Sequence, residues 1–205
     1  CNIHSLIMQQ RNLVLSGGGA RGFAHLGVIK ALQEKGFSFS AISGTSSGAM
    51  VAVLLCDGYS ISEITEMFRE SLPIARFNFH FTQSLLSIES LNKILSKYLR
   101  AKTFEALKHP LFVSTTDVNT GKQVIFNSGE LIQVVVASSS IPIIFPNVFI
   151  NGNPYADGGI SGNLPVEPFL NSNSKTIGVH VNPLCKYNSE LSAIRQLERI
   201  IHLSI

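Results

Sequence analysis

The sequence predicts an α/β domain built on a mainly parallel sheet that helices cover on both faces. Apolar runs of strand length alternate along the chain with longer runs that have the spacing of amphipathic helices. Glycine-rich turns follow the first two strand-like runs. The 205 residues, of which 45% are hydrophobic and 14% charged, suffice for one domain with a large core.

The first two strand–turn–helix units carry the clearest patterns. Residues 12–15 form a short apolar run, a glycine loop follows, and apolar residues then recur three positions apart until Gly36 ends the helix. Residues 37–42 are expected to form the second strand, and residues 49–56 the second helix. Two consecutive units of this kind favour parallel strands joined by helices.

The rest of the chain continues the alternation. The expected helices span residues 60–70, 88–99, 131–138 and 190–205, with one helical turn at 103–107. The expected strands span residues 111–117, 122–127 and 175–181, and a hairpin is expected around Asn151-Gly152. Residues 72–87 are apolar without a regular period, which fits either a loop that covers the core or a mobile flap beside a lipid site.

The first glycine loop has two chemical interpretations. Gly17-x-Gly19-x-x-Gly22 follows a strand and opens a helix, as the dinucleotide-binding fingerprint requires. That fingerprint also needs an acidic residue at the end of the second strand to hold a ribose, and this strand carries none. The alternative is an oxyanion hole, because consecutive glycines let backbone N–H groups converge on one point without side chains in the way.

The second glycine turn, Gly44-Thr45-Ser46-Ser47-Gly48, has the pattern of a nucleophile elbow. It lies between a strand-like and a helix-like run, so Ser46 is expected at the tip of a sharp turn and at the start of a helix. A Cβ at Gly44 or Gly48 would clash in such a bend. The helix N-terminus would favour negative charge that develops at Ser46.

A serine hydroxyl needs a base, which is usually a histidine that a carboxylate orients. Of the six histidines, only His180 and His202 follow Asp157, and neither lies in a glycine-marked loop. His25 is expected to support the first glycine loop or to pack against it. Asp157, followed by two glycines, is either an ordinary turn residue or a carboxylate that serves Ser46 directly as its base.

Three motifs then occur in an order that is typical of one family. They are Gly17-Gly18-Gly19-Ala20-Arg21-Gly22, Gly44-Thr45-Ser46-Ser47-Gly48 and Asp157-Gly158-Gly159. On these residues the chain resembles the patatin-like phospholipase family, and its compact form is similar to members that are mostly bacterial. The resemblance extends to Ala137-Ser138-Ser139-Ser140-Ile141-Pro142 and covers residues 13 to about 181.

The resemblance implies a three-layer α/β/α fold and the hydrolysis of acyl esters of lipids by a Ser–Asp dyad. It implies Ser46 as the nucleophile and Asp157 as the base. The remaining residues that it implies are an oxyanion loop of Gly17, Gly18, Gly19, Ala20 and Arg21, with structural support from Gly22, Gly44, Gly48, Gly158 and Gly159. No cofactor or metal is implied. Transfer of the acyl group to an alcohol instead of water stays open as an alternative, as do dinucleotide binding and a non-catalytic lipid-binding module.

The net charge and the mean hydropathy indicate which kinds of partner to expect. A net charge of +3 without a basic stripe argues against nucleic acid, while a mean hydropathy of +0.26 is compatible with peripheral contact to a membrane as well as with a large core. The sequence leads us to expect a cytoplasmic protein that acts on a lipid or another acyl ester. We expect one domain over residues 8–205 whose C-terminal part is incomplete, with residues 1–7 as a tag, upstream or processed segment.

Overall fold

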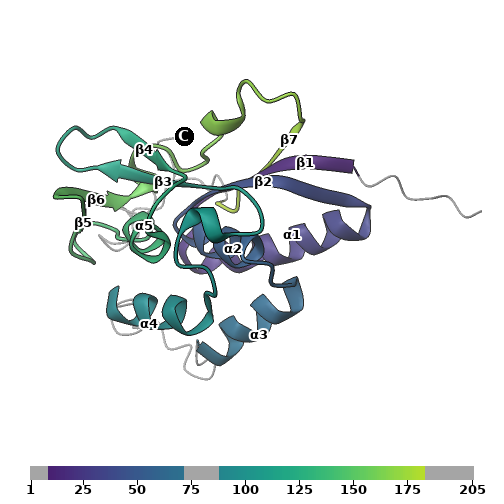
Figure 1. Cartoon of the computed structure of the whole chain (residues 1–205), viewed down its shortest axis with the longest axis horizontal. Helices are drawn as coiled ribbons and strands as arrows, with labels where there is room; N and C mark the ends of the chain where they lie inside the picture. Colours follow the sequence, from purple (N-terminus) through teal and green to yellow (C-terminus); the bar gives the residue numbers. More distant parts are fainter. Residues whose placement is uncertain (1–8, 72–87, 183–205) are drawn as a thin grey trace, which may run out of the picture.

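The computed structural model describes residues 9–71 and 88–182, in which helices flank one central sheet (Figure 1). The strands are β1 (Gln9–Leu15), β2 (Phe37–Thr45), β3 (Leu111–Asp117), β4 (Gln123–Phe126), β5 (Val148–Ile150), β6 (Asn153–Asp157) and β7 (Thr176–Val179). The α-helices are α1 (Phe23–Glu34), α2 (Ser47–Cys56), α3 (Ile61–Ser71), α4 (Ile88–Tyr98) and α5 (Leu131–Ser138). The short 3-10 helices are η1 (Gly19–Gly22), η3 (Phe104–Ala106), η4 (Gly158–Ile160) and η5 (Glu167–Phe169).

The sheet has the strand order β5-β6-β3-β2-β1-β7, and β4 pairs with β3. Strands β7, β1, β2 and β3 are parallel neighbours. Strands β4 and β6 pair antiparallel with β3, and β5 pairs antiparallel with β6. The mainly parallel α/β class predicted from the sequence is confirmed, with antiparallel strands added at one side.

Strand β3 pairs with two different strands along one of its edges. Its first half pairs with β2, up to the pair Thr45 and Ser114, and its second half pairs with β6 from the pair Asp157 and Thr115. Strand β4 overlaps both of these stretches and therefore occupies the other edge of β3. Because β2 runs parallel and β6 antiparallel to β3, their C-terminal ends meet head-on, which brings Asp157 next to the residue after Thr45.

The two faces of the sheet are covered differently. Helices α1, α2 and α5 pack on one face, and α3 and α4 lie beyond them (Figure 1). That face is apolar, with the buried side chains of Leu13, Ile42 and Val113 in the core. The opposite face carries hydroxyls, which bond carbonyl groups of the segment before η5: Ser43 donates to Pro165 (2.6 Å) and Ser114 donates to Gly162 (3.3 Å).

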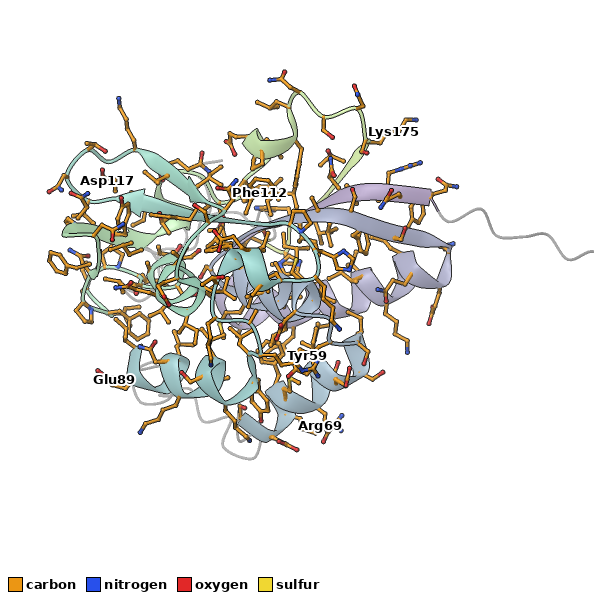
Figure 2. The ribbon with its side chains drawn as sticks, in the orientation of Figure 1. Tyr59, Arg69, Glu89, Phe112, Asp117 and Lys175 are labelled. Carbon is orange, nitrogen blue, oxygen red and sulfur yellow. The ribbon has the colours of Figure 1, made fainter. Side chains whose placement is uncertain are left out.

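The segment with η5 is anchored on this polar face by one aromatic contact. Phe112 lies near the start of β3 (Figure 2), and Phe169 packs edge-to-face against it with ring centroids 5.5 Å apart. Among the described residues, the α-helices lie on one face of the sheet, and the helix expected over residues 190–205 lies outside the described residues. So does the apolar stretch of residues 72–87.

Most of the expected elements are found close to their predicted bounds. The hairpin turn at Asn151-Gly152 has positive φ at both residues, 50° and 82°, as a type I′ turn requires. Ser60 caps α3 by accepting from the Glu63 N–H (3.3 Å), while the Glu63 carboxylate accepts from the Ser60 N–H (2.7 Å). Strands β1 and β2 are longer than predicted because their polar ends still pair with each other.

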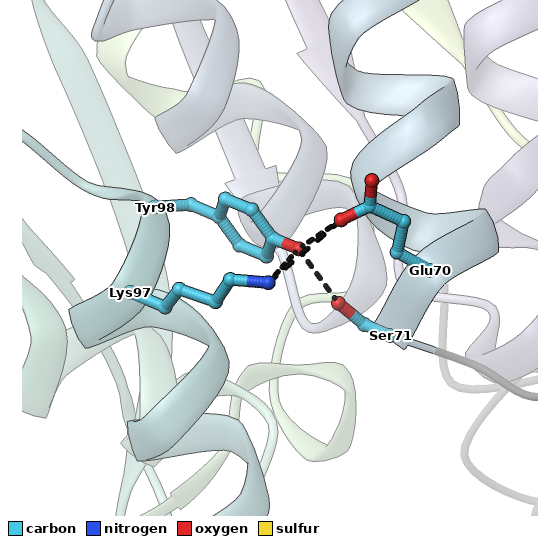
Figure 3. Close-up of polar contacts among 4 residues, drawn as sticks. All are labelled: Glu70, Ser71, Lys97 and Tyr98. Carbon is cyan, nitrogen blue, oxygen red and sulfur yellow. Dashed lines mark hydrogen bonds and ion pairs between the residues drawn. The ribbon is translucent and has the colours of Figure 1, made fainter.

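Helices α3 and α4 are joined at their C-terminal ends by a polar cluster around the Tyr98 hydroxyl (Figure 3). This hydroxyl donates to Glu70 Oε2 (3.1 Å) and accepts from Lys97 Nζ (2.8 Å), and Ser71 Oγ lies 3.5 Å away. Lys97 also forms an ion pair with Glu70 at 3.7 Å. The buried faces of the two helices carry Ile64 and Leu95 into the core, so α3 and α4 form a second helical layer.

Candidate active site

Ser46 occupies a strained turn between β2 and α2. Its φ of 52° and ψ of −123° are rare for a residue with a side chain, and its side chain is nearly buried. The flanking glycines are required by contact. A Cβ on Gly44 would lie 2.8 Å from the Ala49 backbone, and one on Gly48 would lie 2.5 Å from the Leu15 carbonyl oxygen. The predicted elbow is therefore present.

The elbow is tied to β3 and α5 by the hydroxyl of Ser138. This hydroxyl accepts from the Ser46 N–H (2.9 Å) and donates to the Ser114 carbonyl (2.6 Å). All three groups are buried. Ser138 therefore fixes the backbone of Ser46 relative to β3, the strand with which Asp157 of β6 pairs.

We expect Ser138→Ala to lower the free energy of unfolding by about 1–3 kcal/mol, because it leaves the buried Ser46 N–H without its acceptor. Ser139→Ala is the matched control. Ser139 is also buried, but among the described residues its hydroxyl bonds only the Val135 carbonyl, in the helix that Ser139 follows. Urea unfolding of both variants measures the difference. Equal midpoints at unchanged m-values would show that the hydrogen bond between Ser138 and the Ser46 N–H contributes no more to the free energy of unfolding than the bond of Ser139 does.

Asp157 lies at the end of β6 and is buried. Its Oδ1 accepts from the Gly159 N–H (2.7 Å), and the Ser46 hydroxyl lies near enough to the carboxyl to act on its pKa. Its own N–H donates to the Ser140 carbonyl (2.9 Å). Gly158 must lack a side chain, because a Cβ there would be 2.3 Å from the Ser114 carbonyl oxygen.

Burial dominates the electrostatics of Asp157. Desolvation of the carboxylate raises the pKa of Asp157 from 3.8 to about 6, against the opposing effects of the Gly159 N–H and the Ser46 hydroxyl. A carboxylate with this pKa is ionised at neutral pH and is a stronger base than an exposed aspartate. The structure thus brings together the two residues that the sequence singled out, Ser46 and Asp157.

The first glycine loop lies directly against Ser46. A Cβ on Gly17 would be 3.3 Å from the Ser46 Cβ, and the Gly17 carbonyl accepts from the Asn182 amide (2.7 Å). Within residues 9–71 and 88–182, the N–H groups of Gly18 and Gly19 donate to no acceptor. Gly19 has a φ of 53° and open space on its Cβ side.

The remaining residues of the predicted loop play different parts. Ala20 and Arg21 belong to η1 and are exposed, and the Arg21 guanidinium lies 3.5 Å from the Asn182 amide oxygen. Gly22 is buried against Ser47, whose Cβ would lie 2.5 Å from an added Cβ. Gly22 therefore allows α1 and α2 to start close together.

His25 supports the glycine loop, as the sequence suggested. Its Nε2 lies 2.8 Å from the Ser16 carbonyl oxygen, and burial lowers the pKa of His25 below its usual value, so the neutral ring donates this hydrogen bond. His180 follows the last residue of β7 and is exposed, whereas a position inside the strand was predicted. In the part of the chain that the structure describes, no histidine hydrogen-bonds Ser46 or Asp157. His202 lies outside the described residues.

The sequence did not single out Asn163 and Asn182, the two residues that hold the glycine loop through hydrogen bonds to Gly17. The Gly17 N–H donates to the Asn163 carbonyl (3.2 Å), and Asn182 binds the Gly17 carbonyl from the end of the described chain. Asn163 follows Asp157-Gly158-Gly159 by a few positions, which is the only signal that could have pointed to it. Ser138 belongs to the motif Ala137-Ser138-Ser139-Ser140-Ile141-Pro142, but nothing in the spacing of that motif indicated a contact with Ser46.

The described residues offer neither a metal-binding cluster nor a membrane-spanning helix. They contain no group of three or more His, Cys, Asp or Glu side chains placed to hold a metal ion. None of their helices has the length and apolar character needed to cross a membrane.

The sequence and the fold were compared with known proteins. The model of a family described as patatin-like phospholipase matches residues 13–170. The uncharacterized protein R571 of Acanthamoeba polyphaga mimivirus is 31% identical over 83% of this chain and 65% of its own length. The neuropathy target esterase sws of Drosophila melanogaster is 33% identical over 78% of this chain, but only 12% of its own length is covered. The crystal structure of VipD from Legionella pneumophila superposes with a TM-score of 0.51 and 20% identity, over 76% of this chain and 47% of that one.

The chain belongs to the patatin-like phospholipase family, because the family model covers more than half of it. VipD shares the fold, which agrees with the class predicted from the sequence. The relatives by sequence come from a virus and from an insect, so they give no support to the bacterial type that the sequence led us to expect. The chain spans about two thirds of the viral relative and about an eighth of the esterase.

Proposed function

We propose that this chain is a serine hydrolase of lipid acyl esters, with Ser46 as the nucleophile and Asp157 as its base. One observation carries the proposal: β3 brings a buried aspartate, whose pKa is raised to about 6, next to a serine held at a strained elbow. Both features are typical of sites where a hydroxyl is activated for attack. The family to which the chain belongs supports the reaction class.

In the proposed reaction, the Asp157 carboxylate accepts the Ser46 hydroxyl proton as Oγ attacks the carbonyl carbon of the ester. The tetrahedral intermediate carries a negative oxygen, which the free N–H groups of Gly18 and Gly19 stabilise together with the N-terminus of α2. The intermediate collapses to an acyl-serine, and the leaving alkoxide takes the proton from Asp157. Water then attacks the acyl-serine while Asp157 accepts its proton, and Asp157 returns that proton to Ser46 Oγ as the fatty acid leaves.

The geometry argues against the dinucleotide alternative. A ribose would need a carboxylate at the end of β2, and β2 runs into Gly44 and Thr45 instead. The glycine loop also abuts Ser46, where a pyrophosphate would have to lie next to the carboxylate of Asp157. The two anionic groups would repel each other.

A fluorophosphonate probe tests the proposal directly. It reacts covalently with activated serines, so we expect one equivalent of label per chain on Ser46, located by fragmentation mass spectrometry. Asp157→Asn should slow the labelling strongly, because the carboxylate no longer removes the proton. Labelling on a different serine, or equal rates in the wild type and Asp157→Asn, would reject the assignment.

A further inference from the structure

The loop that follows α5 contains a tight turn with an unusual residue at its tip. Pro142 is the second residue of this turn, Ile143 is the third with a φ of 75°, and the Ile144 N–H donates to the Ile141 carbonyl (3.2 Å). The Phe145 N–H donates to the same carbonyl (2.9 Å). A proline followed by a positive φ, closed by this hydrogen bond, is the arrangement of a type II β-turn.

Neither local conformation nor packing explains an isoleucine at this position. The third residue of a type II turn is normally glycine or asparagine, because a positive φ disfavours a side chain, and a β-branched one most of all. Burial in the core could compensate for such a conformation, but 91% of the Ile143 surface is exposed. It is the most exposed large hydrophobic residue in the described part of the chain.

The turn is attached to the proposed site through its neighbours in the sequence. The Ser140 carbonyl accepts the Asp157 N–H (2.9 Å), and the Ile141 N–H, which opens the turn, donates to the Ser139 carbonyl (3.2 Å). Ile143 therefore projects from a short rigid connection three residues after a direct contact of Asp157. Residues 141–146, Ile-Pro-Ile-Ile-Phe-Pro, carry no charge.

We propose that this turn is a lipid-contacting element, in which Ile143 enters the apolar layer of a membrane or micelle while Ser46 acts on an ester drawn from it. The inference rests on the proposed function. An uncharged turn loses no ion hydration when it enters the lipid surface, and an exposed isoleucine gains from leaving water. A single protruding side chain on a proline-stiffened turn fits insertion into a lipid layer better than docking against a flat protein surface.

The test compares vesicle binding with turnover of a soluble ester. Ile143→Gly and Ile143→Asn suit the positive φ, so both should fold with a melting temperature equal to or above that of the wild type. We expect their partition onto phosphatidylcholine vesicles, measured by cosedimentation, to fall about tenfold, as expected from the loss of one buried isoleucine. Hydrolysis of p-nitrophenyl acetate should change less than twofold, and Ile143→Met should keep the binding to vesicles.

Leu170→Asn is the matched control, since Leu170 is 71% exposed but follows η5, which packs near the start of β3. It should bind vesicles as the wild type does. Vesicle binding is measured in a Ser46→Ala background, so the binding result stands whether or not the protein hydrolyses esters. Unchanged binding of Ile143→Gly, an equal loss on the soluble ester, or a change in the oligomeric state of Ile143→Gly relative to the wild type on gel filtration would each overturn the proposal.

Discussion

Ser46→Ala is expected to reduce kcat for ester hydrolysis by about 10⁴-fold or more, as in other enzymes that lose an activated serine. The variant should fold normally, because the change removes one oxygen and leaves the Ser46 N–H bonded to Ser138. The measurement is kcat on p-nitrophenyl butyrate under saturating conditions, with circular dichroism and thermal melting as the test of folding.

Ser47→Ala provides a control within the same turn. Ser47 Oγ is buried and has no hydrogen-bond partner among the described residues, so its removal should change kcat by less than threefold. A loss of activity in Ser47→Ala as large as in Ser46→Ala would mean that the turn as a whole, rather than the Ser46 hydroxyl, is needed. Residual activity above about 10⁻² of the wild type in Ser46→Ala would assign the nucleophile to another residue.

Asp157→Asn is expected to reduce kcat by a similar factor, on the order of 10⁴, because an amide cannot take the Ser46 proton. The effects of the two substitutions should not add, since a base without its nucleophile performs no step. The double variant should therefore be about as active as either single variant. Single substitutions of His25, His180 and His202 should leave most of the activity wherever the variant folds.

The pH dependence follows from the raised pKa of Asp157. The base must be ionised, so kcat/KM of the wild type should rise with pH through about 6 and level off above it. This limb should persist in the histidine variants. A histidine variant that folds normally and loses as much activity as Ser46→Ala would replace the dyad with a triad.

Ionised Asp157 is expected to lower the stability of the folded protein in the same pH range in which it can act as a base. Its folded-state pKa of about 6 lies above the usual 3.8, so the folded state favours the protonated carboxyl and stability falls as pH rises from about 3.8 through 6. Ionisation of the buried carboxyl then costs about 3 kcal/mol at pH 8, by the conversion of 1.36 kcal/mol for each pKa unit. Asp157→Asn should therefore melt at a higher temperature than the wild type at pH 8, and at a similar one at pH 4. An unchanged melting temperature at pH 8 would show that the carboxyl is better solvated than its burial indicates.

The sequence predicted most of the elements, and it singled out Ser46 and Asp157, the two residues proposed for catalysis, because both kinds of feature leave local traces. Glycines mark Ser46 and Asp157, since their turns have no room for a Cβ, and alternating apolar runs mark the strands and helices. The supports of these residues leave no such trace. Ser138 and Asn182 act across 92 and 165 positions of the chain, and nothing in their own surroundings distinguishes them from other polar residues.

The polar face of the sheet and the turn at Ile143 were also beyond local patterns. Ser43 and Ser114 each follow an apolar residue, but nothing in the residues around them indicates that their hydroxyls bond the segment that precedes η5. Ile143 reads as part of an apolar run, and only the backbone shows that it stands exposed at a positive φ. The two interpretations of residues 72–87, a loop that covers the core and a flap beside a lipid site, stay predictions because these residues lie outside the described part of the chain.

The end-to-end meeting of β2 and β6 along β3 has a consequence for folding. Ser46 and Asp157 are far apart in the sequence, and each reaches the other only after its strand has paired with β3. The parallel β2–β3 pairing closes a long loop, which is a slow kind of contact to form. Pairing of β1 with β2 alone, with α1 and α2 packed on it, does not bring Asp157 to Ser46. Reactivity of Ser46 would therefore report that both β2 and β6 have paired with β3, and not only that the apolar residues have collapsed.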